Sequence, residues 1–122
     1  FGRSRPTFSM PSSGDVVELD LGPPGGREAG FRHPAVVVTA QRILDAEPSV
    51  IHVVPLTSTI RGFHSEVVIQ VDPTNGLDVV SAAQCQHIRA VSTHRIADVR
   101  GNVGAALLVQ LREAITVILD LP

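Results

Sequence analysis

The stretch DVVELDLGPPGGREAGFRHPAVVV, residues 15–38, decides the fold because it sets two strand patterns on either side of a glycine-rich loop. Residues 15–21 alternate apolar and acidic side chains, which is the period of a half-buried strand. Residues 35–40 are a nearly unbroken β-branched apolar run, which is typical of a strand inside a small barrel or sandwich. The sequence therefore predicts two strands, with a charged loop at the mouth of the second.

Further strands are predicted outward from this stretch, over residues 50–56, 65–71, 77–84 and 85–92. Between residues 65–71 and 77–84 lies DPTNG, whose Asp-Pro and Asn-Gly pairs favour a hairpin. We therefore expect these two runs to pair antiparallel. QRILDAEP, before residue 50, predicts a short turn or helical excursion that ends at Pro48.

The chain changes period after Gly101 and Gly104, where apolar residues recur at spacings of three and four up to residue 118. This pattern predicts one amphipathic C-terminal helix, with Arg112 and Glu113 turned away from its apolar face. The expected fold class is α+β and mainly β: a curled sheet or small barrel of about five to six antiparallel strands, followed by that α-helix.

The length of 122 residues suits one domain with a hydrophobic core. We expect a flexible N-terminal leader over residues 1–13 and a single domain over residues 14–122. No apolar run approaches the roughly 20 residues that a membrane helix needs, so we expect no membrane association.

The charge balance limits the kind of partner. All ten basic residues are arginine, and twelve acidic residues give a net charge of −2, so any contact with nucleic acid must be local. The single cysteine, Cys85, excludes an internal disulfide and a cysteine-built zinc site. We interpret Cys85 as a small buried residue and expect a cytoplasmic protein.

Several common motifs are missing from the sequence. The loop glycines follow neither the Rossmann nor the P-loop spacing, and they lead into a strand instead of a helix. The chain has no G-x-S-x-G elbow and no helical pair of metal-binding histidines. We therefore expect no metal and no cofactor, and we interpret His52 as a hydrogen-bonded residue at the edge of the core.

Three polar clusters remain at strand ends and loops. They are Glu28, Arg32 and His33; Thr57, Ser58, Arg61 and His64; and Gln86, His87 and Arg89. Each cluster alone is compatible with a solvated loop. Together they supply arginine charge, hydroxyls and imidazoles, which suit metal-free RNA cleavage: a base takes the 2′-OH proton, the oxygen attacks the phosphorus, and an acid protonates the leaving 5′-oxygen. DNA lacks this nucleophile.

Three ordered segments carry a resemblance to a known family. GDVVELDLGPPGGREAGFRHPAVVVT, then VVPLTS, then CQHIRAVSTHRI resemble the MazF/PemK family of toxin endoribonucleases. The resemblance implies an SH3-like barrel with a C-terminal helix, a homodimer and sequence-specific cleavage of single-stranded RNA, leaving 2′,3′-cyclic phosphate and 5′-hydroxyl ends. It also implies a MazE-like antitoxin that inhibits the toxin by covering its RNA groove.

The site residues follow from this resemblance. Glu28 and Thr57 match the family's active-site loop and turn, and His33 precedes Pro34 where the family usually has its catalytic arginine. Neighbouring residues of an extended chain point to opposite sides, so Arg32 and His33 should not both enter the site unless the loop bends. We expect His33 to occupy the catalytic position, with Arg32 reaching phosphate from the loop or Arg89 supplying the charge. The remaining expected RNA contacts are Arg27, Ser58, Arg61, His64, Gln86, His87 and Arg89.

A second departure is Gln86-His87, where the family favours aspartate-glutamine, and it predicts an altered recognition sequence. Two alternatives stay open. The first is an RNA- and antitoxin-binding module of the same fold with weak or no activity, because of the change at His33. The second is a CcdB-like gyrase poison, although such toxins use a tryptophan-containing C-terminal tip and this chain has no tryptophan.

Overall fold

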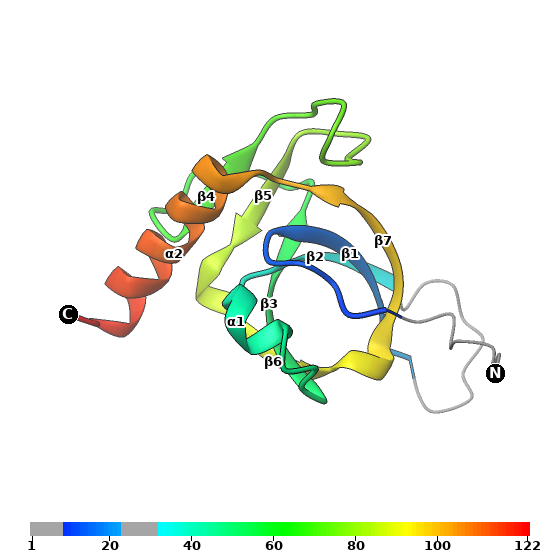
Figure 1. Cartoon of the computed structure of the whole chain (residues 1–122). Helices are drawn as coiled ribbons and strands as arrows, with labels where there is room; N and C mark the ends of the chain where they lie inside the picture. The colour runs from blue at the N-terminus through cyan, green and yellow to red at the C-terminus, as the bar shows by residue number, and fades with distance from the viewer. Residues whose placement is uncertain (1–8, 23–31) are drawn as a thin grey trace, which may run out of the picture.

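The computed structural model describes residues 9–22 and 32–122 of the chain. These residues form seven strands, and one long helix follows the last strand. Figure 1 shows how the elements are arranged. The elements are β1 (Asp15–Asp20), β2 (Arg32–Val37), α1 (Gln41–Leu44), β3 (Val50–Thr57), β4 (Glu66–Ile69), β5 (Ser81–Gln84), the 3-10 turn η2 (Cys85–His87), β6 (Arg89–Ser92), the 3-10 turn η3 (Thr93–Arg95), β7 (Ile96–Asn102) and α2 (Ala105–Leu119).

The strands form one curved antiparallel sheet in the order β4-β5-β3-β2-β1-β7. β3 is the branching strand, because residues 50–53 pair with β6 whereas residues 56–57 pair with β5. The sheet is an open path with β4 and β7 at its two ends. The expected α+β class is confirmed, and the described strands number seven instead of five or six.

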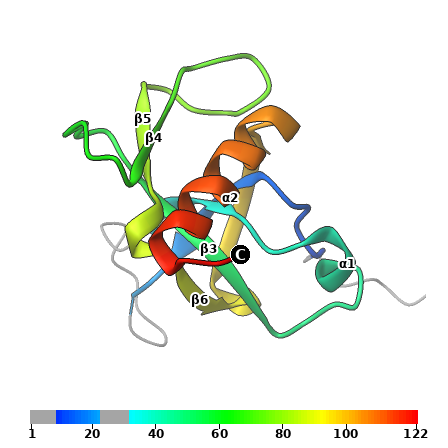
Figure 2. The same ribbon diagram turned by 90° about the vertical axis from the view of Figure 1, so that its left-hand side faces the viewer.

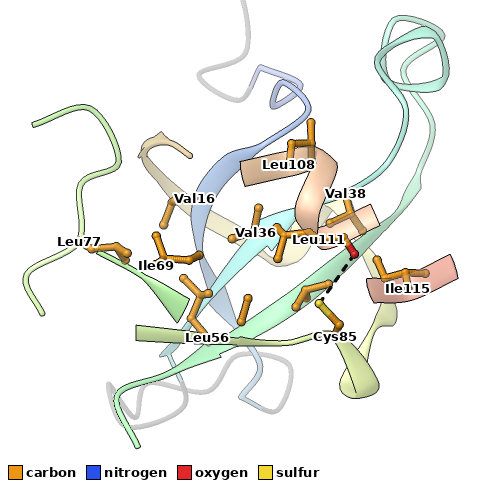
Figure 3. Close-up of a cluster of buried hydrophobic side chains, with 12 residues drawn as sticks. Val16, Val36, Val38, Leu56, Ile69, Leu77, Cys85, Leu108, Leu111 and Ile115 are labelled. Carbon is orange, nitrogen blue, oxygen red and sulfur yellow. Dashed lines mark hydrogen bonds between the residues drawn. The ribbon is translucent and has the colours of Figure 1, made fainter. Parts of the chain in front are cut away.

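Both faces of the central strands are buried. Neighbouring residues of a strand point to opposite faces, so Val16 and Val36 join one hydrophobic cluster whereas Val17 and Val37 join another. Burial on both sides explains why the sequence of β2 is an apolar run without alternation. Figure 3 shows the first cluster, which comprises Val16, Val36, Val38, Val54, Leu56, Ile69, Leu77, Ala83, Cys85, Leu108, Leu111 and Ile115.

The predicted C-terminal helix is confirmed as α2. Its buried residues are Leu108, Leu111 and Ile115, which pack on the sheet side that carries the first cluster (Figures 2 and 3). Cys85 is fully buried beneath the helix, as expected, with its Sγ 3.9 Å from the Leu111 carbonyl oxygen. Burial raises the pKa of this thiol to about 11, so it stays protonated and inert near neutral pH.

Arg112 does not turn away from the molecule, contrary to expectation. It is half-buried, and its Nη2 donates to Ser13 Oγ at 2.7 Å and to the Val38 and Thr39 carbonyls at 3.2 and 3.3 Å. The long arginine stem lets the guanidinium reach carbonyls beyond the end of β2 although Cα lies at the margin of the buried face. Its neighbour Glu113 is exposed, as expected.

Replacement of Arg112 by alanine is expected to lower the free energy of unfolding by about 1.5–3 kcal/mol, because hydrogen bonds to a charged group are lost and the Val38 carbonyl loses both of its bonds from the guanidinium. The matched control is Glu113→Ala at the next position, where an exposed side chain should change stability by no more than about 0.5 kcal/mol. Urea denaturation of both variants measures the difference. Equal effects of the two changes would contradict this role of Arg112.

Two expected strands are shorter or interrupted. β5 begins at Ser81, so residues 77–80 lie outside it. Of the strand expected over residues 85–92, residues 85–87 form η2 instead, and β6 spans residues 89–92. The predicted pairing of the two runs around DPTNG is confirmed, with Glu66 opposite Gln84 and Ile69 opposite Ser81. The connection between β4 and β5 is much longer than a tight hairpin. It packs against β7 through the hydrogen bond from Asn102 N to Thr74 O (2.9 Å).

β7 is the strand that the sequence did not predict. Most of its side chains are exposed or half-buried, so it lacks the alternation that marks a buried face. It pairs with β1 at the end of the sheet, with two irregularities in register. The expected helical excursion after residue 40 is confirmed as α1.

Candidate functional site

A first cavity of about 440 Å³ opens where β2, β3 and β7 approach the segment before β5. It contains four of the residues expected at the active site, and they come from two elements distant in sequence. Arg32 and His33 begin β2, whereas Thr57 ends β3 and Ser58 follows it. Among the described residues, its lining comprises Arg32, His33, Pro34, Leu56, Thr57, Ser58, Leu77, Asp78, Val79, Ser81 and Arg100.

A second cavity of about 360 Å³ shares His33 and Pro34 with the first. Its walls are more apolar, with polar groups contributed by Gln84, His87 and Arg89. Within residues 9–22 and 32–122, the lining comprises Leu19, Leu21, His33, Pro34, Val53, Pro55, Gln84, His87 and Arg89. His33 therefore lies on the wall between two adjoining cavities.

Strand pairing fixes the position of His33. In the register of β1 and β2, Leu19 lies opposite His33 and Asp20 opposite Arg32. Both Arg32 and His33 are exposed, and both line the first cavity. Of these two residues, only His33 also lines the second cavity.

Thr57 is half-buried at the end of β3, where its Oγ1 accepts a hydrogen bond from Thr59 N at 3.1 Å. This short turn orients the hydroxyl and uses an acceptor position, which leaves the hydroxyl proton for a ligand. Ser58 beside it is exposed. The VVPLTS segment thus supplies two hydroxyl groups to the first cavity.

The third expected cluster lies on two elements: Gln86 and His87 belong to η2, and Arg89 begins β6. His87 and Arg89 are exposed and line the second cavity, whereas Gln86 lines neither of the two. A 3-10 turn does not follow the two-residue alternation of a strand, so Gln86 turns inward. Its Oε1 is buried and has no hydrogen-bond partner among the described residues.

Arg61 and His64 lie apart from both cavities. Arg61 is exposed, with its backbone N–H donating to Glu66 Oε1 at 3.1 Å, and His64 lines a separate groove beside α2. Arg27 and Glu28 fall outside the described residues. His52 is exposed, and the hydrogen bonds at this residue join its backbone to Thr39, so its interpretation as a core-edge side chain is wrong.

Sequence reasoning missed four polar residues that line the cavities: Asp78, Ser81, Gln84 and Arg100. Arg100 lies on β7, a strand that the sequence did not predict. A single arginine outside any predicted element is a weak indication of a binding site. The Arg100 guanidinium pairs with Asp78 at 3.0 Å and with Glu18 at 3.6 Å. The described part of the first cavity wall therefore includes two arginines and one exposed carboxylate.

The loop that follows β4 is stabilised by its own hydrogen bonds. Hydrogen bonds from Thr74 and from the Asn75 backbone lower the pKa of the exposed Asp72 carboxyl. In the part of the chain that the structure describes, no group of three or more His, Cys, Asp or Glu side chains is arranged to hold a metal ion. None of the described helices is long and apolar enough to span a membrane.

Comparison with known proteins identifies the family. PemK-like, MazF-like toxins of type II toxin-antitoxin systems match residues 12–119. Endoribonuclease MazF9 of Mycobacterium tuberculosis is 39% identical over 116 residues, covering 92% of this chain and 98% of that protein. Among solved structures, Mycobacterium tuberculosis toxin MazF-mt6 has a TM-score of 0.71 at 24% identity, covering 88% of this chain and 98% of that one.

The MazE-MazF structure from Deinococcus radiodurans (Form-II) has a TM-score of 0.74 at 23% identity and covers 94% of this chain and 100% of that one. These two structural likenesses reflect a shared fold. The match over residues 12–119 and the 39% identity to MazF9 identify the family as well as the fold. This chain belongs to the family of PemK-like, MazF-like toxins of type II toxin-antitoxin systems.

Proposed function

We propose that this toxin is an endoribonuclease that cleaves single-stranded RNA at His33, where its two cavities meet, without a metal ion. The observation that carries the proposal is the shared wall: one imidazole lies between a cavity rich in cations and hydroxyls and a second, more apolar cavity. A phosphodiester at His33 would place one neighbouring nucleotide toward each cavity. This arrangement suits chemistry at the bond between two nucleotides.

The reaction follows from the groups available. A base removes the proton of the ribose 2′-OH, O2′ forms a bond to the adjacent phosphorus, and the bond from phosphorus to O5′ breaks. An acid protonates O5′, which leaves a 2′,3′-cyclic phosphate and a 5′-hydroxyl. In this proposal His33 transfers one of these two protons. Glu28 is the candidate for transfer of the other proton, and only the resemblance to the family supports it.

Two further groups stabilise the transition state in this proposal. Arg32 supplies a fixed positive charge to the phosphoryl oxygens from the same cavity as His33. The Thr57 hydroxyl, oriented by the bond from Thr59 N, donates a hydrogen bond to one of those oxygens. Selectivity for RNA over DNA follows from the requirement for a 2′-OH nucleophile.

Partners of the toxin are proposed from its relatives. A mycobacterial endoribonuclease was solved in complex with its cognate antitoxin, with a TM-score of 0.73 to this chain. We extend this to the present chain as an antitoxin that covers the cavities around His33, and we propose a homodimer that acts on RNA in the cytoplasm.

The test is incubation of the folded, antitoxin-free protein with a mixed-sequence single-stranded RNA in excess EDTA, followed by mapping of the new ends. Cleavage at a short consensus with cyclic phosphate and 5′-hydroxyl ends is expected. The matched control is 2′-O-methyl RNA of the same sequence, which has no free nucleophile and should stay intact. Failure of folded protein to cleave would favour a catalytically weak binding module.

A further inference from the structure

Arg100 is a cation of the first cavity that the proposed chemistry leaves without a role. It extends from β7 into the wall that also contains Arg32 and Thr57, and its side chain is 27% exposed. A half-buried guanidinium can present part of its donor fork to a cavity while its stem remains packed. Arg100 is therefore placed to meet a ligand.

Two carboxylates hold the guanidinium in different ways. Glu18, from β1, lies 3.6 Å from Nη1 and its side chain is 25% exposed, whereas Asp78 accepts from Nη2 at 3.0 Å and its side chain is 87% exposed. Ion pairs with a solvated partner contribute little net stability. The pair with Asp78 can therefore be exchanged for another anion while Glu18 keeps the arginine in place.

The backbone holds Asp78 close to Arg100. The loop of residues 72–76 lies directly against β7: a side chain at Gly76 would collide with the Arg100 carbonyl, and one at Gly101 would collide with the Thr74 carbonyl. Asn75, at 1% exposure, fastens the loop by donating to Gln70 O (2.8 Å) and accepting from Leu77 N (3.0 Å). Asp78 follows this fixed loop.

We propose that Arg100 binds a phosphate group of the RNA in the first cavity and that Asp78 is an internal competitor which the phosphate displaces. This inference rests on the proposed function, since it requires RNA in that cavity. The Asp78 carboxylate occupies the position of the phosphate oxygens on Nη2. RNA binding then exchanges one anion for another without leaving the guanidinium unpaired.

The experiment measures binding of a fluorescein-labelled, mixed-sequence 2′-O-methyl RNA by anisotropy at several salt concentrations. Each phosphate contact contributes about 0.7 to the slope of log K against log salt for single strands. Arg100→Gln is expected to weaken binding and to reduce that slope by about 0.7. A loss of structure alone would not reduce the slope by the amount expected for one phosphate contact. Thermal unfolding checks that the variant is folded.

The second variant, Asp78→Asn, changes an exposed side chain and should not affect folding. It is expected to tighten binding about two- to fivefold, because the competing carboxylate is gone. Asp120→Asn is the matched control: it removes the same charge at an exposed site in the left-handed region, which asparagine tolerates. Its effect on binding is expected to be smaller.

An unchanged salt slope in Arg100→Gln would overturn the assignment of Arg100 as a phosphate ligand. Equal tightening by Asp78→Asn and Asp120→Asn would overturn the role of Asp78, because only overall charge would then matter. Absence of any binding by the wild type would overturn both. The proposed function fails separately, by intact unmodified RNA in the cleavage assay, because the modified probe reports binding alone.

Discussion

Alanine in place of His33 is expected to slow the cleavage of single-stranded RNA by about 10²- to 10⁴-fold, the range associated with loss of a positioned proton-transfer group. Among the described residues, only His33 and Pro34 line both cavities, and the proposed function places the cleaved bond at His33. Single-turnover rates on an RNA with one mapped cleavage site measure the loss directly. His52→Ala is the matched control, because His52 is an exposed histidine on β3 that lines neither cavity.

Two further variants separate the role of His33 from that of Arg32. Arg32→Ala should also lower the rate, as expected when a charge that stabilises the transition state is removed. His33→Arg restores the residue that the family usually has before the proline, and it supplies charge without a readily exchanged proton. If Arg32→Ala abolishes cleavage while His33→Ala leaves it unchanged, Arg32 and not His33 has the catalytic role.

The largest effect on stability is expected at Leu111. This side chain is completely buried in the first cluster, between α2 and the sheet. Leu111→Ala is expected to lower the free energy of unfolding by about 2–5 kcal/mol, through lost transfer energy and the cavity that remains. Urea denaturation monitored by circular dichroism measures this change from the shift in midpoint at constant slope.

The control for Leu111 lies on the same helix. Val117 is 79% exposed, so Val117→Ala removes little buried surface and replaces a β-branched residue with a better helix former. The free energy of unfolding of this variant should differ from that of the wild type by no more than about 0.5 kcal/mol. Comparable losses in the two variants would mean that α2 is not held to the sheet through the face that contains Leu111.

Much of the fold was predictable because burial leaves a pattern in the sequence. The apolar residues of β1 and α2 recur at the period of a strand or a helix, whereas β2 and β3 appear in the sequence as short β-branched apolar runs. β7 buries little and therefore has no such pattern. The 3-10 turn η2 replaces the start of the expected strand over residues 85–92 and contacts α2, a contact between distant parts of the chain that local sequence does not report.

The candidate site was predictable where residues lie beside strand ends and unpredictable where they depend on the path of the chain. Arg32, His33, Thr57 and Ser58 meet because β2 and β3 are neighbours in the sheet. Arg61 and His64 follow Ser58 closely in sequence, yet the connection to β4 leads them away from both cavities. Arg100 enters the site through the pairing of β7 with β1, a contact between distant parts of the chain.

The wall that His33 and Pro34 provide to both cavities also constrains how the toxin can diverge. A substitution there reshapes two neighbouring binding positions at once, so preferences for the two nucleotides would change jointly. Substitutions at Ser58 and His87, by contrast, each belong to one cavity and could accumulate independently. New target sequences would therefore arise more easily from the outer walls than from the residues between the two cavities.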